Sequence, residues 1–395
     1  MTLMRMSRST KAAATAGDVL ALVRDGLVAT RSDIIRVTGL SRTAVTARLS
    51  ALQASGLVLE LPDTESTGGR PPSRLAFNAD AGVVLAAAIG RSRTQLAVCN
   101  LSGQVLTSVD IDQEIGTGPD ELMPDLVKRL EALLEDAGRR PDEIRGVGLS
   151  IPGSADSARV CSLDSPAMSG WDGVPLTPFL QSITTAPIRL DNDANVIVLS
   201  ERRGQRDRFD DMLLIKASTG LGAGIVAGGV LQRGAVGGAG QFGHTKIPEA
   251  AGKVCRCGDT GCLETVASGW ALVRAMREHD RDIAHIRELV DLALAGDPHA
   301  RQLIRESGRH IGEVLSGAVN LLNPAALVLA GDMAKAYDIL VAGLRETVYA
   351  NAIALATREL QILPSTHGDE AGVIGCAALI LDHVLSPAVV DATLP

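Results

Sequence analysis

The chain carries Gly243-His244, then Cys255-Arg256-Cys257-Gly258, then Gly261-Cys262-Leu263-Glu264. Three of its six cysteines fall within eight residues, and the histidine precedes the first of them by eleven positions. Three thiolates and one imidazole complete the tetrahedral shell of a structural Zn²⁺ and leave no open position for water. The alternatives are a chance cluster or a disulfide, and nothing in the chain indicates the oxidising compartment that a disulfide needs. The spacing therefore predicts one structural zinc per chain, bound by His244, Cys255, Cys257 and Cys262.

Length and composition narrow the class of protein. The 395 residues suggest two or three domains, and the low aromatic content of 2% means that the cores are built from Ala, Val, Leu and Ile. The first thirty residues contain no long apolar run of the kind that marks a secretory signal, and no run is long enough to span a membrane. We therefore expect a cytoplasmic protein that does not act at a membrane.

Charge is distributed unevenly along the chain. Residues 1–74 carry ten Lys or Arg and six Asp or Glu, whereas the remainder carries 28 basic and 40 acidic residues. A basic N-terminal segment followed by an acidic remainder indicates that the N-terminal segment binds a polyanion such as nucleic acid.

Three short helices are predicted near the start of the chain, over residues 17–24, 30–37 and 41–55. Thr30 and Ser41 are good N-caps, and Asp33 lies in the first turn of the second helix, where a negative charge is favourable. Gly39 ends that helix. Two helices joined by a tight turn that contains glycine are typical of a helix-turn-helix.

The third helix has one apolar and one polar face. Val45, Leu49 and Leu52 recur at helical spacing and predict the buried stripe. The opposite face carries the candidate DNA-binding residues Arg42, Thr43, Thr46 and Ser50. We expect this helix to enter the major groove of double-stranded DNA, although a packing module with a solvated polar face would show the same pattern.

A wing is predicted after the helices. Residues 57–61 and 75–78 are predicted strands around a loop over 63–72. Arg70 lies between Gly69 and Pro71, and an arginine held in this way suits a narrow minor groove. A solvated linker arginine is the alternative for Arg70.

The larger part of the chain predicts an α/β fold with two related lobes. Strands over 83–89, 94–100 and 104–111 precede a helix over 121–137 and a strand over 144–151. A second set of strands begins at 212–217 and is interrupted by a glycine-rich turn over 218–224. The repeated order of strands and helices suggests a cleft between the lobes.

These residues resemble the ROK family, whose name joins repressors, open reading frames and sugar kinases. The resemblance is nearly full length. It rests on the zinc motif and on Gly68-Gly69-Arg70-Pro71, Pro152-Gly153, Asn192-Asp193-Ala194-Asn195, Leu263-Glu264 and Leu322-Asn323-Pro324. It implies an N-terminal winged helix-turn-helix over 1–78 and an actin-like, sugar-kinase-type domain over 79–395. The lobes would comprise about 79–190 with a C-terminal helix, and 191–370, with a zinc loop over 244–262.

The resemblance also implies a sugar site between the lobes. Asp193 matches the catalytic base of the family kinases, Asn192 matches a residue that binds sugar hydroxyls, and Glu264 and His244 match further sugar contacts. Gln241 stands where the family has a sugar-binding glutamate. Seen from the residues alone, a carboxylate and an amide at the end of a buried strand suit hydroxyl recognition, but an exposed turn would look the same.

The phosphate side of the kinase pattern is degenerate. Family kinases begin their first strand with Asp-x-Gly-Gly-Thr, and the matching segment here is Ala88-Ile89-Gly90-Arg91-Ser92. Ala88 cannot hold a magnesium ion, and Arg91 is bulky where a glycine would leave room for phosphate. Ala167 also replaces a sugar-binding asparagine.

We therefore expect a regulator without catalytic residues, in which Asp193 is a vestigial base. It would be a repressor of carbohydrate uptake or catabolism genes that responds to a sugar or sugar derivative. It would read an inverted-repeat operator as a homodimer or a dimer of dimers. The alternatives are an ATP-dependent hexose kinase with an accessory DNA-binding domain, and a regulator that answers to a partner protein.

Overall fold

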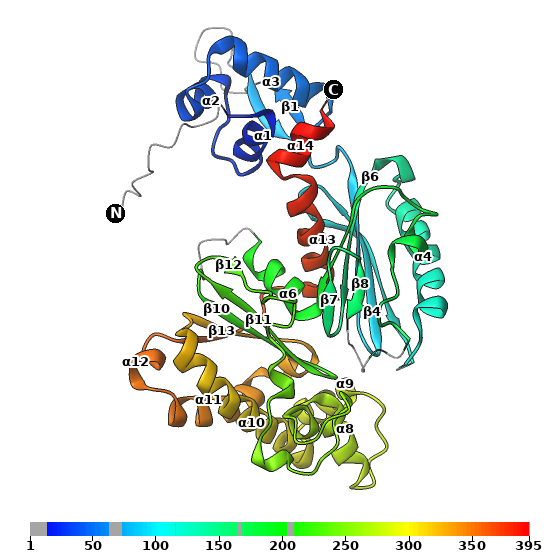
Figure 1. Ribbon diagram of the computed structural model, residues 1–395, viewed down its shortest axis with the longest axis vertical. Coiled ribbons are helices and arrows are strands. Elements are labelled where there is room, and N and C mark those ends of the chain that lie inside the picture. The colour runs from blue at the N-terminus through cyan, green and yellow to red at the C-terminus, as the bar shows by residue number, and fades with distance from the viewer. Residues whose placement is uncertain are drawn as a thin grey trace. The chain divides into compact units, whose positions relative to one another are not determined.

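The structure, a computed structural model, describes residues 14–62, 73–114, 116–163, 168, 170–203 and 209–394. The chain divides into two compact units. Unit 1 comprises residues 1–83, 100–102 and 381–395, and unit 2 comprises residues 84–99 and 103–380. Figure 1 shows the elements of both.

Unit 1 begins with three helices, α1 (Ala16–Arg24), α2 (Arg31–Thr38) and α3 (Arg42–Ala54). The predicted caps form: Thr30 and Asp33 make a reciprocal capping box, and the Ser41 side chain accepts a hydrogen bond from the Ala44 amide. Gly39 ends α2 with a left-handed φ of 72°, a conformation that favours glycine. Two antiparallel strands follow, β1 (Val58–Leu61) and β2 (Arg74–Phe77). The loop predicted to form the tip of the wing, including Arg70, lies outside the described residues.

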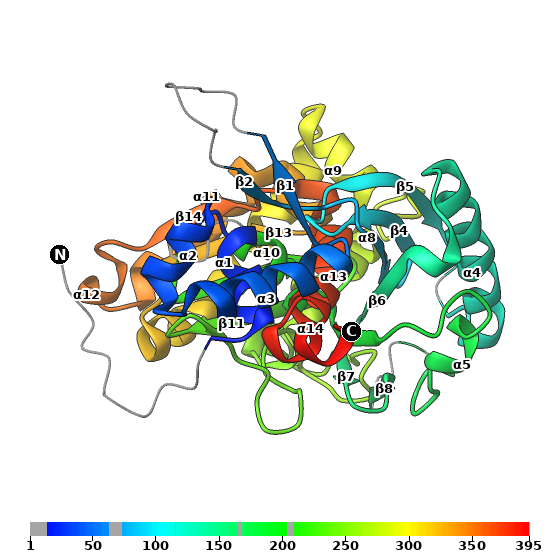
Figure 2. The same ribbon diagram turned by 90° about the horizontal axis from the view of Figure 1, so that it is seen from above.

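A helix from the far end of the sequence completes unit 1. In α14 (Pro387–Thr393), Asp391 accepts a hydrogen bond of 2.8 Å from the amide of Gly17 in α1. A Cβ on Gly17 would lie 2.4 Å from the backbone of Pro387, so the two helices approach closely because Gly17 has no side chain. Figures 1 and 2 both place α14 beside α1. The sequence analysis did not predict this contact.

Unit 2 contains two five-stranded sheets of the same design. The first has the order β5-β4-β3-β6-β9 and the second has the order β12-β11-β10-β13-β14. In each, three consecutive strands are followed by two strands that arrive later in the chain. The strands of the first sheet are β3 (Val83–Ile89), β4 (Arg93–Asn100), β5 (Val105–Asp112), β6 (Ile144–Ile151) and β9 (Ile188–Asn192). Those of the second are β10 (Met212–Ala217), β11 (Leu221–Ala227), β12 (Val230–Leu231), β13 (Ala326–Ala330) and β14 (Gln361–Pro364).

The second sheet is buried on both faces because its strands alternate two apolar sets. Leu213 and Ile215 pack into one core with the long helices α10 (Pro298–Leu322) and α11 (Tyr337–Asn351). Met212 and Leu214 pack on the other face against α6 (Asp193–Arg202) and the start of α13 (Ala371–Val384). These layers bring the start of α6 and the start of α13 to the same end of the sheet (Figure 1).

The remaining described elements of unit 2 are shorter or lie beside the sheets. They are α4 (Pro119–Asp136), β7 (Ser154–Asp156), β8 (Cys161–Leu163), α5 (Thr177–Leu180), α7 (Glu264–Ala267), α8 (Gly269–Arg277), α9 (Ile286–Leu294) and α12 (Ala354–Thr357). Within the described part of the chain, no single helix is both long and apolar enough to cross a membrane. By length and composition alone, the segments Gly368–Val384 and Pro387–Thr393, bent by 61°, meet that test together.

Candidate functional site

The four predicted metal ligands lie together. His244 ends a short 3-10 helix, and one ligand atom from each of His244, Cys255, Cys257 and Cys262 lies within 4.8 Å of all the others. The Cys255 Sγ to His244 Nδ1 distance and the Cys257 Sγ to Cys262 Sγ distance are both 3.7 Å. Two thiolates about 2.3 Å from a tetrahedral ion lie roughly 3.8 Å apart, so the donor set fits a metal such as zinc. The three thiols are free, which removes the disulfide alternative for these residues.

The surroundings of the cluster affect the protonation and the orientation of its ligands. Burial raises the pKa of Cys255 to about 12, so without a metal this thiol keeps its proton. A coordinated metal deprotonates such a thiol. Lys246 donates a 3.2 Å hydrogen bond to Cys262 Sγ and forms a 2.6 Å ion pair with Asp259, and such contacts orient metal ligands. Sequence reasoning did not single out Lys246, because one lysine in a polar loop carries no distinctive pattern.

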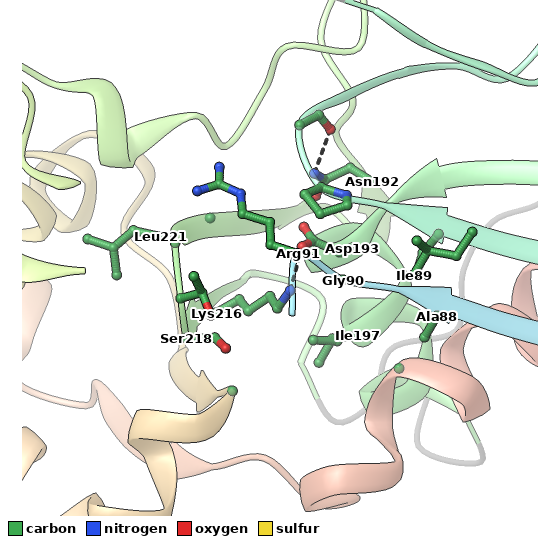
Figure 3. A pocket seen from close by; sticks show the side chains of 18 of the residues that line it. Ala88, Ile89, Gly90, Arg91, Asn192, Asp193, Ile197, Lys216, Ser218 and Leu221 are labelled. Carbon is green, nitrogen blue, oxygen red and sulfur yellow. Dashed lines mark hydrogen bonds and ion pairs between the residues drawn. The ribbon is translucent and has the colours of Figure 1, made fainter. Parts of the chain in front are cut away.

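A cavity of about 380 Å³ lies between the two sheets of unit 2. Its described walls include the turn between β3 and β4, the β9–α6 junction, the turn between β10 and β11, and the start of α13 (Figure 3). The structure brings five predicted sugar-site residues to this cavity: Asn192, Asp193, Gln241, His244 and Glu264. Ala167, also singled out from the sequence, lies outside the described residues.

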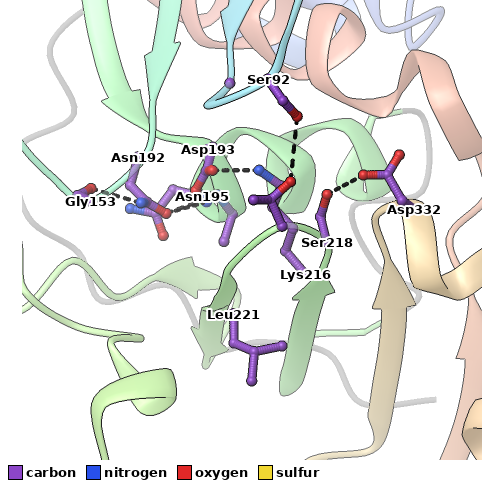
Figure 4. Close-up of polar contacts among 12 residues, drawn as sticks. Ser92, Gly153, Asn192, Asp193, Asn195, Lys216, Ser218, Leu221 and Asp332 are labelled. Atoms are coloured by element: carbon purple, nitrogen blue, oxygen red, sulfur yellow. Dashed lines mark hydrogen bonds and ion pairs between the residues drawn. The ribbon is translucent and has the colours of Figure 1, made fainter. Parts of the chain in front are cut away.

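Asn192 uses its side chain to build the α6 terminus. Its Oδ1 accepts hydrogen bonds from the amides of Ala194 at 2.8 Å and Asn195 at 3.3 Å. Its Nδ2 donates a 2.7 Å bond to the carbonyl of Gly153 (Figure 4). Both lone pairs of Oδ1 are used in this way, and one N–H of the amide is left for a ligand. Because Asn192 caps α6, which begins at Asp193, it also positions Asp193.

Asp193 does not stand alone in the cavity. Lys216, at the end of β10, forms an ion pair with Asp193 Oδ2, as Figures 3 and 4 show. Both side chains are about one-fifth exposed, at 21% for Lys216 and 17% for Asp193. The ammonium of Lys216 occupies one of the two oxygens of the Asp193 carboxylate. No pattern in the sequence indicates this pairing, because Lys216 is a single lysine near the end of an otherwise apolar strand.

Glu264 is held rigidly and is only partly satisfied. Its side chain is 2% exposed, and its Oε1 accepts a 2.8 Å bond from the amide of Leu221. Its Oε2 lies 4.0 Å from Nη1 of Arg91, and neither atom has a hydrogen-bond partner among the described residues. A ligand hydroxyl between them could accept from Arg91 and donate to Glu264. Such a ligand would relieve the cost of two unsatisfied buried polar atoms.

Gly220 makes this arrangement possible. A Cβ at residue 220 would lie 2.8 Å from Glu264 Oε1 and 3.3 Å from Arg91 Nη1. The turn between β10 and β11 therefore needs a residue without a side chain, so that both charged groups can approach the backbone.

The side of the cavity opposite the sugar residues lacks a metal-binding carboxylate at residue 88. Ala88 has no ligand atom. A Cβ added at Gly372 would lie 2.9 Å from the Cβ of Ala88, so α13 packs closely against Ala88. Ser218 hydrogen-bonds Asp332, and the Ser92 and Thr219 hydroxyls are 3.5 Å apart (Figure 4). Asp332 supplies a carboxylate on this side, and the sequence analysis did not name it as a site residue.

The candidate DNA-reading surface is in unit 1. Val45, Leu49 and Leu52 of α3 are buried, as predicted. The four polar residues predicted to face DNA are exposed on α3: Arg42, Thr43, Thr46 and Ser50. Thr46 Oγ1 donates a 3.0 Å bond to the carbonyl of Arg42, which leaves its oxygen free to accept. This face can therefore offer a guanidinium and three hydroxyls to a partner.

The fold and these sites define a class of protein, namely a winged helix-turn-helix in one chain with a two-lobed sugar-kinase-type domain. The chain belongs to the ROK family, whose model matches residues 84–383. It is 28% identical over 382 residues to the "Xylose repressor" of Caldicellulosiruptor bescii, covering 93% of this chain and 95% of the repressor. It is 30% identical over 308 residues to the "Glucokinase" of Halalkalibacterium halodurans, covering 74% of this chain and 93% of the kinase.

The solved structures similar to this chain likewise include both a transcriptional regulator and a sugar kinase. A ROK family transcriptional regulator described as a homologue of the E. coli MLC protein superposes with a TM-score of 0.78 at 26% identity, covering 95% of this chain and 96% of that one. A glucokinase from Streptomyces griseus, solved with glucose and AMPPNP, superposes with a TM-score of 0.64 at 27% identity, covering 75% of this chain and 99% of its own. These two kinases thus match about three-quarters of the chain, whereas the xylose repressor and the solved regulator match nearly all of it.

Proposed function

We propose that the protein is a sugar-responsive, DNA-binding transcriptional regulator, most simply a repressor of carbohydrate uptake or catabolism genes. The observation that carries the proposal is the pair formed by Lys216 and Asp193. The group that would deprotonate a sugar hydroxyl is engaged by an ammonium, while hydroxyl-binding groups around it remain. The site thus favours binding over phosphoryl transfer.

Sugar binding is supported by the unsatisfied atoms of Arg91 and Glu264. Isothermal calorimetry with a panel of hexoses and pentoses should find a ligand for the full-length protein. Glu264→Ala should reduce its affinity about 100-fold, or about 2.7 kcal/mol, because a buried acceptor is lost and Arg91 is left unpaired. The matched control is Glu131→Ala, on the exposed surface of α4. A panel in which no sugar or sugar derivative binds would refute this part of the proposal.

The same site argues against kinase activity. Ala88 supplies no ligand for magnesium, and positioning of the metal-bound triphosphate provides most of the catalysis in phosphoryl transfer. The runner-up function, a hexose kinase, is favoured by the glycine turn after β10 and by the 30% identity to a glucokinase. A coupled assay with ATP and the sugar panel separates the two, and turnover on the order of 1–100 per second would establish the kinase.

DNA binding is supported by the exposed polar face of α3. Arg42→Ala should weaken operator binding by about 1–3 kcal/mol if the guanidinium reads a guanine, whereas Arg301→Ala on α10 should have no effect. The operator fragments can be selected from genomic DNA with the purified protein. If a chain lacking residues 1–75 still retards these fragments, the assignment to unit 1 is wrong.

The remaining parts of the proposal concern assembly and metal. We expect a cytoplasmic protein that binds an inverted-repeat operator as a homodimer or a dimer of dimers. The reason is that two helix-turn-helix units related by two-fold symmetry match the two half-sites of such an operator. We expect one structural Zn²⁺ per chain, and metal analysis that finds far less than one would exclude it. If sugars bind but leave operator affinity unchanged, a partner protein becomes the better candidate for the signal.

A further inference from the structure

A second cavity of about 290 Å³ adjoins the sugar cavity in unit 2. The two cavities share Ser92, Thr219 and Arg256 as lining residues, so a ligand in one can reach the other. The remaining walls come from α8 and from the segment that enters α9. This second cavity is called the arginine pocket below.

The charge of the arginine pocket is entirely positive. Its titratable lining residues are Arg256, Arg274, Arg277 and His285, and none of the described residues that line it carries a carboxylate. Carboxylates lie near this set without lining the pocket. Glu278 Oε1 is 3.8 Å from Arg274 Nε, Glu288 accepts hydrogen bonds from the amides of Ala284 and His285, and Glu264 lines the adjoining cavity. The Glu278 contact is exposed and offsets little of the charge. Three guanidiniums around one small volume create a potential that favours an anion.

Trp270 organises two of these cations. The guanidinium carbon of Arg256 lies 4.8 Å from the indole centroid and that of Arg274 lies 5.1 Å from it, so both make cation–π contacts with one ring. Trp270 Nε1 is buried in the pocket wall and has no acceptor within the described part of the chain. A buried indole N–H without an acceptor is costly, and an anionic oxygen would satisfy it.

The main cavity adds a further donor on the side of this pocket. Arg91 Nη1 is buried without a hydrogen-bond partner among the described residues, and the turn that carries Arg91 also carries Ser92, which lines both cavities. The charge of Arg91 is partly offset by Glu264, whose Oε2 lies 4.0 Å from Arg91 Nη1.

We propose that the arginine pocket binds the anionic group of the effector, which is a sugar that bears a phosphate ester or a carboxylate. The sugar ring lies in the main cavity, so the inference rests on the proposed function and specifies its ligand class. Arginine is suited to this role because its planar guanidinium donates paired hydrogen bonds to phosphate and carboxylate oxygens.

The test uses the full-length protein and calorimetry with three matched sets: neutral sugars, their phosphate esters, and the corresponding sugar acids. One anionic set should bind at least about tenfold more tightly than its neutral parent, which is about 1.4 kcal/mol. Comparison of the ester and acid sets identifies the anionic group. Inorganic phosphate alone should bind weakly and compete with the anionic ligand but not with the neutral parent.

Three variants locate the effect. Arg274→Gln should remove the preference for the anionic form and leave the neutral parent unchanged. Trp270→Phe keeps an aromatic face for the two arginines but loses the N–H together with the fused second ring, so it should lower anion affinity several-fold. Arg301→Gln, an exposed arginine on α10, is the control and should change neither affinity. Circular dichroism and zinc content confirm that each variant is folded.

The outcomes separate the two proposals. If neutral and anionic forms bind equally and Arg274→Gln changes neither, the arginine pocket is not an anion site and the sugar-binding function stands. If no sugar form binds but phosphate binds and is lost in Arg274→Gln, the pocket takes an anion and the sugar function fails. If neither sugars nor phosphate bind, both proposals are overturned.

Discussion

The two sheets of unit 2 present equivalent hairpins to one cavity, and the hairpins differ in chemistry. The turn between β3 and β4 carries Arg91, whereas the turn between β10 and β11 carries Thr219 and Gly220. The second turn keeps the small residues that let charged groups approach its backbone. The first has a bulky cation in the matching place. Two sheets with the same strand order can therefore present different turns to the cavity, one built from small residues and the other carrying a fixed positive charge. The residues in each turn determine this difference.

The largest expected effect concerns the support of the second turn. Cys257→Ser should abolish zinc binding and lower sugar affinity by more than about 100-fold, because Cys262 directly precedes the Leu263-Glu264 segment that holds the Leu221 amide. Metal analysis and calorimetry on the same preparation measure both effects. Cys161→Ser, a change to a buried cysteine outside the cluster, controls for loss of a thiol. Full sugar affinity in a zinc-free Cys257→Ser protein would show that the second turn needs no such support.

A smaller effect is expected from filling the second turn. Gly220→Ala places a Cβ 2.8 Å from Glu264 Oε1, so the carboxylate must move and sugar affinity should fall about 10- to 50-fold. Gly317→Ala is the matched control, since a Cβ at that position in α10 meets nothing within 4 Å and alanine favours helix. Unchanged affinity in Gly220→Ala would mean that Glu264 does not contact the ligand.

The first turn should matter less for binding. Arg91→Ala removes the donor that faces Glu264, and we expect about a tenfold loss of affinity for a neutral sugar. The variant should still show no turnover with ATP, because residue 88 remains alanine. Arg129→Ala, on the exposed face of α4, is the control. Kinase activity in Arg91→Ala would show that bulk at the first turn was the sole barrier to phosphoryl transfer.

The smallest effect is expected where the two turns meet. Ser92→Ala removes the 3.5 Å contact with the Thr219 hydroxyl, which is at the limit of hydrogen bonding. Sugar affinity and melting temperature should therefore change little, by about twofold at most in affinity. A much larger loss would show that closure of the lobes depends on this contact.

Local patterns made the helices α1, α2 and α3 and the metal cluster predictable. Caps, a glycine turn and a buried stripe depend on residues within one or two helical turns, and the metal motif depends on short spacing. The Lys216–Asp193 and Arg91–Glu264 pairs join residues 23 and 173 positions apart, and their geometry follows from how the sheets pack. The Arg256–Trp270–Arg274 stack likewise joins the metal loop to α8 without a pattern in either segment.

The contact between α1 and α14 sets the order in which unit 1 can be completed during synthesis. Gly17 emerges from the ribosome early, but its hydrogen-bond partner Asp391 follows 374 residues later. Val390, which is 1% exposed, is part of the same packing. The helices α1, α2 and α3 of a nascent chain therefore lack their last supporting helix until residue 391 has left the ribosome. A truncated chain without α14 should consequently hold unit 1 less stably than the full-length chain does.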